Sequence, residues 1–326
     1  MGAMITIRTA FVFATAIWVQ QAPCQEIRTY LGMSDASAAA AIGREHFVVA
    51  DDECNTLLIY QRGQPKAIGS LELSTFLGTK DERESDLEGA ATIGTRIYWI
   101  SSHGLNTKGE VREERRRFFA TDMQPGQPPT LKPFGEPYRN LLQDLLADDK
   151  LKAYNLADAA KWPPEMSEDG KMGLNIEGLA ATPDGKLLIG FRNPIRGGLA
   201  LIVPVENPGD LLKGEKARFG SPIGLDLRAR GIRSIERVGS DYLIVAGPPG
   251  KEGSFDLYRW SGKAAEAASL VTGIDVSKLA PEALFAIPGT DTVQILSDDG
   301  GGPRVKCKGQ EKEKSKQSFR SIIVKP

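Results

Sequence analysis

Polar residues recur at equivalent positions in five short segments of the chain, and these are the residues whose types could do chemistry. Glu88, Glu177 and Glu282 each precede a glycine or an alanine at the start of an apolar run. Two weaker copies of the segment carry Ser37 and Arg233 at the same place. An internal repeat of this kind determines how the whole fold is interpreted, so the five positions are the starting point.

The charges at these positions fit two kinds of chemistry. Carboxylates suit calcium, a hard cation that takes six to eight oxygen ligands, and Glu88, Glu177 and Glu282 are the candidate ligands. Crowded carboxylates also raise one another's pKa, which makes Glu88 and Glu177 candidates for a general acid/base pair. His103, one of only two histidines, is the candidate base or ligand beside them.

The elements that must position these residues are short strands. Each segment leads into a small-residue strand, a turn, a second strand that ends in polar residues, and further strand-like runs rich in β-branched and aromatic residues. The segments are about 50 residues apart, the size of one four-stranded propeller blade. The sequence therefore predicts an all-β protein with a single β-propeller of five four-stranded blades, and six blades are the alternative.

One interval, between Glu88 and Glu177, is too long for a single blade. Apolar residues at helical spacing follow Asn140, so we expect a small helical insertion at about residues 138–165, between blades 2 and 3. A degenerate sixth blade is the other interpretation. The last unit lacks a fourth strand, whereas residues 26–31 have no blade of their own, so we expect this N-terminal strand to complete the C-terminal blade.

The geometry of a blade predicts a polar bowl at one mouth of the central channel. The start of the first strand and the end of the antiparallel second strand lie on the same face. The second-strand ends add His103, Arg192, Asn193, Asp51 and Asp298 to the five repeat positions. Arginines can hold a phosphate or carboxylate bidentately, so Arg192 and Arg233 are candidate binders of an anionic substrate, with Asn193, Asp51 and Asp298 as further contacts.

Structural roles are the alternatives for the same residues. The glutamates can form an ion-pair network with the two arginines, and such networks also perturb pKa values. Asp51 and Asp298 are equally consistent with ordinary loop turns, in which aspartate side chains accept hydrogen bonds from nearby backbone.

Composition and charge limit the partners and the location. The 326 residues are 41% hydrophobic, and the formal net charge of −1 disfavours nucleic acid as a partner. A basic start, a short apolar run and small residues predict that residues 1–24 are a secretory signal peptide, with a buried N-terminal helix as the alternative. The run is too short to span a membrane comfortably. The remaining chain, 25–326, is the propeller, expected in the periplasm or secreted, as a monomer.

Two cysteines, Cys54 and Cys307, follow the predicted signal peptide. In an oxidising compartment this even pair is expected to bridge the first and last repeats. Two unpaired thiols are the alternative.

Several of these motifs resemble a known family. The segments Val48–Glu53, Asp86–Gly89, Asn175–Leu179, Gly231–Glu236 and Ile295–Gly300 are similar to the bacterial family known as domain of unknown function 3616. The resemblance spans essentially the whole mature chain and implies no activity. The Glu-Gly start is also similar to esterase-like phytase and gluconolactonase-type propellers, a resemblance that implies a channel-mouth glutamate holding calcium.

Two functional hypotheses follow from the sequence. The first is a calcium-dependent phosphoester or lactone/ester hydrolase with its site at the channel mouth. The second is a non-catalytic propeller that binds a small-molecule ligand or a protein partner in the periplasm.

Overall fold

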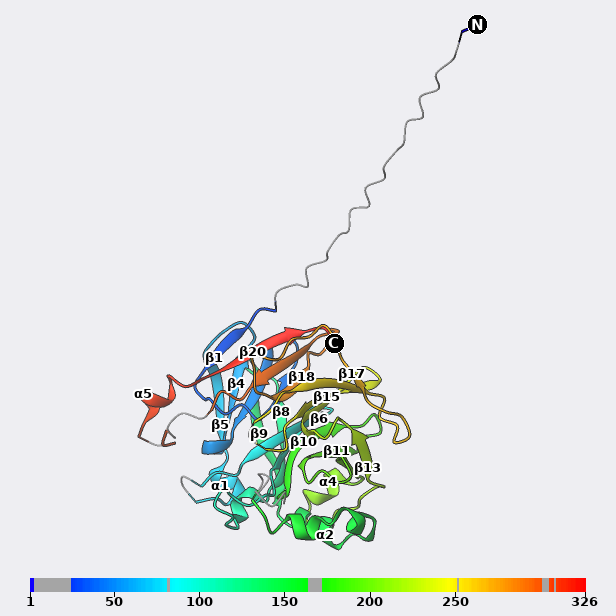
Figure 1. The fold of residues 1–326 in the computed structure, drawn as a ribbon. Helices are drawn as coiled ribbons and strands as arrows, with labels where there is room; N and C mark the ends of the chain where they lie inside the picture. Colours follow the sequence, from blue (N-terminus) through cyan, green and yellow to red (C-terminus); the bar gives the residue numbers. More distant parts are fainter. Residues whose placement is uncertain (3–24, 81–82, 164–171, 251, 301–304, 308) are drawn as a thin grey trace.

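Five antiparallel sheets of four strands each surround a central axis and form a β-propeller (Figure 1). The computed structural model describes residues 1–2, 25–80, 83–163, 172–250, 252–300, 305–307 and 309–326. The predicted signal peptide therefore lies almost wholly outside the described residues. The innermost strands contact one another in a closed order, β2 to β6, β10, β14, β18 and back to β2. This closure confirms the all-β, five-bladed prediction.

In four of the five blades, the four strands are consecutive in the sequence. Blade 1 consists of β2 (Ala38–Ile42), β3 (His46–Asp51), β4 (Thr56–Gln61) and β5 (Ala67–Glu72). Blade 2 consists of β6 (Leu87–Ile93), β7 (Arg96–Ser101), β8 (Phe118–Gln124) and β9 (Thr130–Tyr138). Blade 3 consists of β10 (Asn175–Ala181), β11 (Leu187–Asn193), β12 (Leu199–Val205) and β13 (Ile223–Asp226). Blade 4 consists of β14 (Gly231–Val238), β15 (Asp241–Gly247), β16 (Asp256–Trp260) and β17 (Ser269–Leu270).

Blade 5 joins the two ends of the chain, and this is the exception. It consists of β18 (Pro281–Ala286), β19 (Val293–Ser297), β20 (Ser318–Val324) and, outermost, the N-terminal β1 (Arg28–Leu31). The antiparallel pairing runs from Arg28 with Ser321 to Leu31 with Ser318. The predicted completion of the C-terminal blade by residues 26–31 is thus confirmed (Figure 1).

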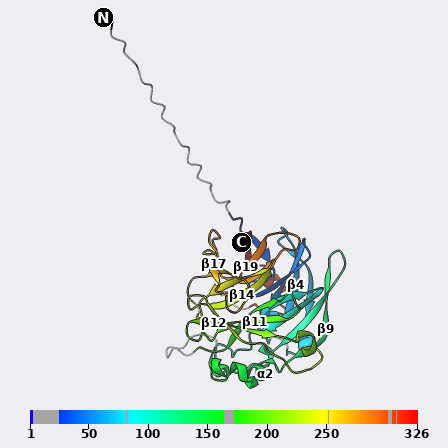
Figure 2. The same cartoon turned by 90° about the vertical axis from the view of Figure 1, so that its right-hand side faces the viewer.

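Helices are few and short. α2 (Leu141–Ala147), η3 (Asp149–Tyr154) and α3 (Leu156–Ala159) form the predicted helical insertion between β9 and β10. The other short helices are η1 (Asp52–Cys54), α1 (Ser74–Leu77), η2 (Glu113–Arg115), α4 (Pro208–Leu211) and α5 (Glu311–Lys314). Figures 1 and 2 show α2 at the end of the molecule remote from the C-terminus. In the described part of this interval blade 2 is the only sheet, so the alternative of a sixth blade there is wrong.

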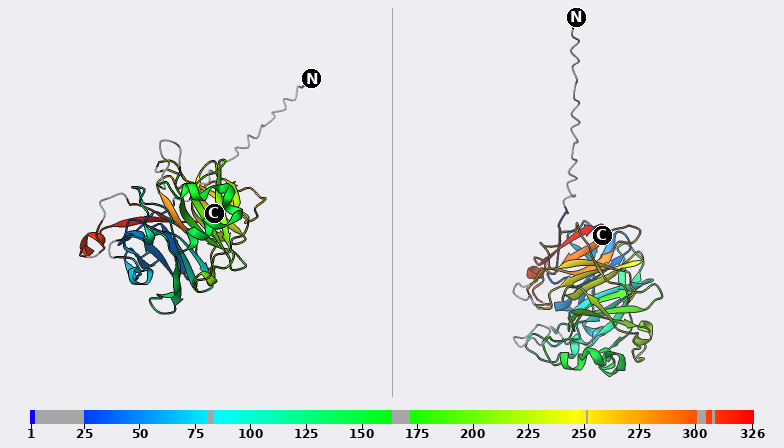
Figure 3. Two further views of the ribbon diagram at one scale, coloured as in Figure 1. Left: turned by 90° about the horizontal axis from the view of Figure 1, so that it is seen from below. Right: turned by 45° about the vertical axis from the view of Figure 1, so that its right-hand side comes forward.

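Hydrophobic residues divide between the two faces of each blade and form a separate core at each blade–blade interface. In β7, Trp99 packs in the core shared with blade 1, whereas Ile100 packs in the core shared with blade 3. Alternation along a strand sends successive side chains to opposite faces, so nearly all of β7 is buried. These five cores pack neighbouring blades against one another. Figure 3 shows the arrangement of the blades in two further views of the ribbon.

A disulfide joins blades 1 and 5. Cys54, at the end of η1, is bonded to Cys307, in the segment between β19 and β20, with the Cα atoms 5.3 Å apart. The predicted bridge between the first and last repeats is therefore confirmed. Across the described residues, no helix is long and apolar enough to cross a membrane.

Candidate functional site at the channel mouth

A β-bulge places the repeated polar residue in four of the five blades. The strand pairing slips between Leu87 and Gly89 and at the equivalent point in β10, β14 and β18. The residue skipped by each slip is Glu88, Glu177, Arg233 or Glu282. A bulge leaves one residue out of the ladder and changes the direction of its side chain, which is how these four depart from the faces that pack between blades. In blade 1 the pairing of β2 is regular, and Ser37 immediately precedes it.

Four of the five positions are joined in one chain of polar contacts across blades 1, 5, 4 and 3. We call Ser37, Glu88, Glu177, Arg233 and Glu282 the channel-mouth ring. Ser37 donates to Glu282 Oε2 at 3.2 Å. Glu282 Oε1 pairs with Arg233 Nη2, and Arg233 Nε lies 2.9 Å from Glu177 Oε2. Arg233 therefore bridges two carboxylates that come from the neighbouring blades on either side.

Glu177 is the most enclosed member of the ring, with 2% of its surface exposed. Its Oε1 accepts from Asn175 Nδ2 at 2.8 Å and from Arg192 Nη1 at 3.0 Å. Arg192 is held in turn by the backbone that follows β15, donating to the carbonyl oxygens of Pro248 at 3.3 Å and Gly250 at 2.6 Å. Both carboxylate oxygens of Glu177 thus face a guanidinium, one from Arg192 and one from Arg233.

Glu88 differs from the other two glutamates. Its side chain is only partly buried, and it makes no hydrogen bond or ion pair with any residue that the structure describes. Burial, and then the negative charges of Glu177 and Asp86, raise the pKa of Glu88 well above its usual value, against the opposing effect of Arg233 and Arg192. The chain of contacts is therefore interrupted at blade 2, where the Glu88 carboxyl has no partner among the described residues.

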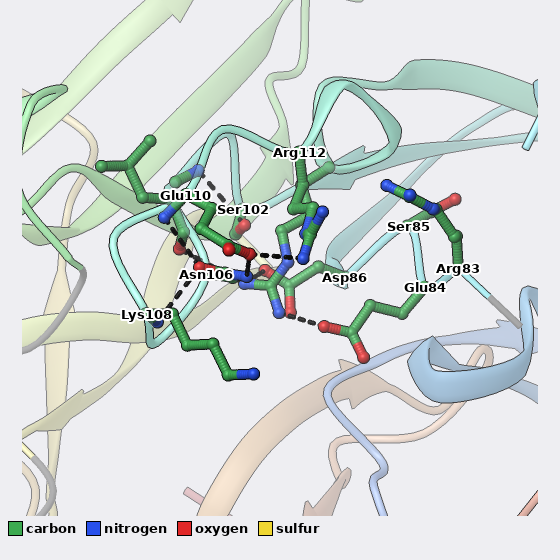
Figure 4. A network of polar contacts seen from close by, with 12 residues as sticks. Arg83, Glu84, Ser85, Asp86, Ser102, Asn106, Lys108, Glu110 and Arg112 are labelled. Atoms are coloured by element: carbon green, nitrogen blue, oxygen red, sulfur yellow. Dashed lines mark hydrogen bonds and ion pairs between the residues drawn. The ribbon is translucent and has the colours of Figure 1, made fainter.

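A second polar network lies beside Glu88. Asp86, in the left-handed region with φ of 53°, pairs with Arg115 Nη1 at 2.9 Å, and Arg115 also pairs with Glu84. Figure 4 shows Glu84 and Asp86 near the loop that carries Asn106, Lys108, Glu110 and Arg112. Arg115 is common to this network and to an adjoining cavity of about 400 Å³, whose other lining residues are Arg83, Glu84, Asn106, Thr107, Lys108, Arg112 and Glu114.

His103 lies apart from the solvent-accessible part of the mouth. It is 2% exposed, and its Nδ1 lies 2.8 Å from the carbonyl oxygen of Ser101, so Nδ1 carries the proton in the neutral ring. Burial is the main cause that lowers the pKa of His103 to about 4, and the positive charges of Arg116 and Arg117 add to it. Nε2 has no partner among the described residues. The imidazole of His103 is therefore neutral and enclosed.

The predicted substrate contacts divide into two groups. Asn193 donates from Nδ2 to the carbonyl oxygen of Pro249 at 2.9 Å, so it shares the 248–250 segment with Arg192. Asp51 is buried and pairs with Lys314 of α5 at 2.6 Å. Asp298 accepts from the Gly300 amide at 2.8 Å, and burial together with Asp35 raises its pKa to about 6. Asn193 belongs to the wall of the mouth, whereas Asp51 is enclosed beneath α5.

The calcium ligands predicted from the sequence, Glu88, Glu177 and Glu282, stay a prediction, and two of them are paired with an arginine in this arrangement. Arg233 lies between Glu177 and Glu282 and contacts both, so a cation shared by them would need the space that the guanidinium fills. Within the described residues, no group of three or more histidine, cysteine, aspartate or glutamate side chains is placed to hold a metal ion.

Sequence reasoning found the ring positions but missed several of their partners. Asn175 belonged to a quoted motif yet was given no role, and the 248–250 segment that holds Arg192 and Asn193 was not among the predicted site residues. The signal available for Asn175 was a polar residue two positions before Glu177 on the same strand, which places both side chains on one side. The Asp86–Arg115 pair had no such local signal, because its two members lie far apart in the sequence.

Comparison with known families finds the same family over part of the chain, which includes two of the five motifs, Asn175–Leu179 and Gly231–Glu236. Residues 133–293 match the family described as "Protein of unknown function (DUF3616)". No curated protein matches the chain significantly.

Solved structures are similar to this chain at low identity. PQQ-bound aldose sugar dehydrogenase from Streptomyces coelicolor is 10% identical, with a TM-score of 0.43, over 92% of this chain and 99% of that one. A luciferin-regenerating enzyme is 9% identical, with a TM-score of 0.44, over 92% of this chain and 95% of that one. The GH43 protein BlXynB from Bacillus licheniformis is 13% identical, with a TM-score of 0.44, over 82% of this chain and 50% of that one. Similarities this distant carry no argument about activity.

Proposed function

We propose that the protein is a hydrolase that cleaves an ester or lactone bond of a small polar molecule at the channel mouth, with Glu88 as the general base. The observation that carries this proposal is the contrast within the ring. Glu177 and Glu282 are bound by arginine, whereas Glu88 is accessible and lacks a partner among the described residues. A general base must be able to reach the proton it removes, and only Glu88 of the three meets that condition.

The contacts that Arg192 and Arg233 already make favour an uncharged ester or lactone over a phosphoester as the substrate. Binding a phosphate bidentately requires a guanidinium with two N–H groups directed at the ligand. Arg192 is committed to Glu177 and to two backbone carbonyl groups, and Arg233 to two carboxylates. A phosphate at this site would therefore meet cations whose charge is already neutralised.

The proposed reaction uses one proton transfer in each direction. Glu88 takes a proton from a water molecule while the water oxygen bonds to the ester carbonyl carbon. The tetrahedral intermediate then expels the alcohol oxygen, and the carboxylic acid of Glu88 returns the proton to it. Arg233 Nη1, which has no partner among the described side chains, is available to donate to the developing oxyanion. Ester and water give acid and alcohol, so the atoms balance.

The test is a hydrolysis screen of p-nitrophenyl esters, γ- and δ-lactones and phosphate monoesters. The wild type should hydrolyse an ester or lactone, and Glu88→Gln should lower kcat/KM by roughly 10²- to 10⁴-fold, because a positioned base contributes about that much. Glu136→Gln, an exposed glutamate in β9, is the matched control and should retain full activity. Full activity in Glu88→Gln, or cleavage of phosphate monoesters alone, would contradict the proposal.

A calcium requirement is tested in the same assay. Rates measured with added calcium and with a chelator should agree if Arg233 stays between Glu177 and Glu282. A rate that depends on calcium would mean that the cation displaces this arginine, and it would favour the calcium-dependent mechanism predicted from the resemblance.

A non-catalytic binding propeller is the second candidate. The two ion pairs and one hydrogen bond that join four of the five ring positions favour it, because networks of this kind also serve as rigid scaffold. Binding of a lactone without turnover, lost in Glu88→Gln, would identify this function. We also propose a periplasmic or secreted location, which the Cys54–Cys307 disulfide supports because such bonds persist in oxidising compartments.

A further inference from the structure

A cavity of about 140 Å³ lies among the innermost strands of the propeller, away from the channel-mouth ring. It is lined almost entirely by small and apolar residues of the innermost strands of blades 1, 2 and 5, with one carboxyl from blade 4. The lining residues are Ala39, Ala40, Ala41, Ala90, Ala91, Thr92, Phe285, Ala286, Pro288 and Glu236.

The position of this cavity along the channel follows from the strands. Glu236 comes three residues after Arg233 in β14, and Phe285 comes three residues after Glu282 in β18. A strand rises about 3.3 Å per residue, so the cavity lies roughly 10 Å beyond the ring. Ala41, Thr92 and Ala286 are half-buried, so the cavity is reached from the end of the channel opposite the ring.

Small side chains create the space. The run Ala38–Ala41 in β2 and the pair Ala90–Ala91 in β6 leave the channel side of these strands without bulk. A cavity of about 150 Å³ with an apolar lining holds a molecule of the size of benzene in another protein. The present cavity therefore has room for a ligand of about five heavy atoms.

Glu236 is the only charged residue that lines the cavity. Its Oε1 accepts from the Ala286 amide at 3.3 Å, and the backbone N–H of Arg237 also hydrogen-bonds the carboxyl group. Arg237, its neighbour on the same strand, is exposed and donates to the carbonyl oxygen of Gly239 at 3.2 Å. The lining residues of β2, β6 and β18 carry no charge. Within the described residues Glu236 makes no ion pair, and it presents its carboxyl to an apolar space.

We propose that this cavity binds a short primary alkylammonium ion, with the ammonium group on Glu236 and the alkyl chain among the alanines and Phe285. A carboxylate removed from water is stable when it is paired with an opposite charge, which an ammonium supplies. The alanine lining accommodates the methylene groups, whereas an anion of the same size is repelled by Glu236. This site is independent of the hydrolysis proposed at the ring.

The pH dependence of binding follows from the same environment. Burial raises the pKa of Glu236 to about 7, opposed by the Ala286 amide and the charge of Arg237. The carboxyl is therefore mostly protonated below that pH and ionised above it, whereas an alkylamine stays protonated to about pH 10. Binding of an alkylammonium should strengthen as the pH rises from 6 to 8.

The experiment measures binding of n-butylammonium chloride by ligand-observed NMR, with 1-butanol and sodium butyrate as matched neutral and anionic probes. Butylammonium should bind at least 10-fold more tightly than either, and Glu236→Gln should lose that preference. Thr92→Leu, which fills the cavity without removing the charge, should weaken all three probes. Glu88→Gln should bind butylammonium as the wild type does, which separates this site from the ring.

Three results would overturn the proposal. They are the absence of butylammonium binding to the wild type at pH 8, binding of butylammonium that Glu236→Gln leaves unchanged, and equal binding of 1-butanol and butylammonium. The circular dichroism spectrum and the melting temperature of each variant establish that it is folded before binding is measured.

Discussion

At the residue scale, Arg233 stabilises the channel mouth by neutralising two carboxylates that blades 3 and 5 bring together. Glu177 and Glu282 are 2% and 7% exposed, so neither is screened well by water. Removing one partner from such a group leaves a buried charge uncompensated, which costs more free energy than the loss of an exposed ion pair. Arg233 is thus a structural requirement of the site as well as a candidate oxyanion donor.

Arg233→Met should therefore lower the free energy of unfolding by about 3–5 kcal/mol, the range found when one partner of a buried ion pair is removed. Arg237→Met is the matched control, because Arg237 lies four residues further along β14 with an exposed side chain. Its effect should stay within about 0.5 kcal/mol. Urea denaturation of both variants measures the difference, and equal stability of the two would show that the ring is not held by Arg233.

The sequence was sufficient to place the ring residues but not to pair them. The glutamates at 88, 177 and 282 were predicted to meet at one mouth because the repeat puts them at equivalent points of equivalent blades. Whether a given glutamate is bound by arginine depends on distances between blades, which no local pattern encodes. His103 shows the same limit, since no local pattern indicates that its side chain is buried.

At the element scale, the Glu-Gly motif combines a bulge with a close contact between blades. A Cβ on Gly178 would lie 2.8 Å from Ile232 Cγ2, 3.0 Å from Ile235 Cγ2 and 3.1 Å from Gly190 Cα. These neighbours belong to β14 in blade 4 and to β11 in blade 3 itself. Gly178 therefore allows β10 and β14 to approach each other directly after the bulge has turned Glu177 toward the axis.

Gly178→Ala should lower the free energy of unfolding by about 1–3 kcal/mol, because the added methyl group overpacks the junction of the two blades. Gly209→Ala in α4 is the control, since the nearest atom to its Cβ would be Tyr98 Oη at 3.8 Å. Thermal melting of the two variants checks the prediction. A melting temperature of Gly178→Ala equal to that of the control would mean that the glycine is not needed for blade packing.

The long inner strands could be predicted from the sequence, whereas the β-bulges and the short strand β17 could not. β3, β7, β11, β15 and β19 have continuous apolar runs, and all were predicted from composition and spacing. The bulges were missed because a single extra residue does not disturb the apolar pattern that marks a strand. β17, with only two residues, Ser269–Leu270, and an exposed surface, has no pattern that distinguishes it from a loop.

At the scale of the whole molecule, the propeller closes through β1 and β20 and is tied further by the Cys54–Cys307 bond. Closure removes the open sheet edges that would otherwise pair with other chains. In the closed propeller the channel has two zones. One is the charged mouth with Glu88, and the other is the alanine-lined cavity with Glu236. The repeat predicted the closure, whereas the second zone depends on small residues that sequence reasoning assigned only to strands.

The central claim is that Glu88 is the one ring glutamate left without a partner and able to exchange a proton at the channel mouth. Carbon-13 NMR of protein labelled at the glutamate side-chain carboxyl carbons tests it directly, with Glu88→Gln used to assign the resonance. The account predicts that this resonance titrates well above the usual glutamate value of about 4.3. A Glu88 resonance that titrates at or below that value would contradict the account, because it would show a paired or fully hydrated carboxylate.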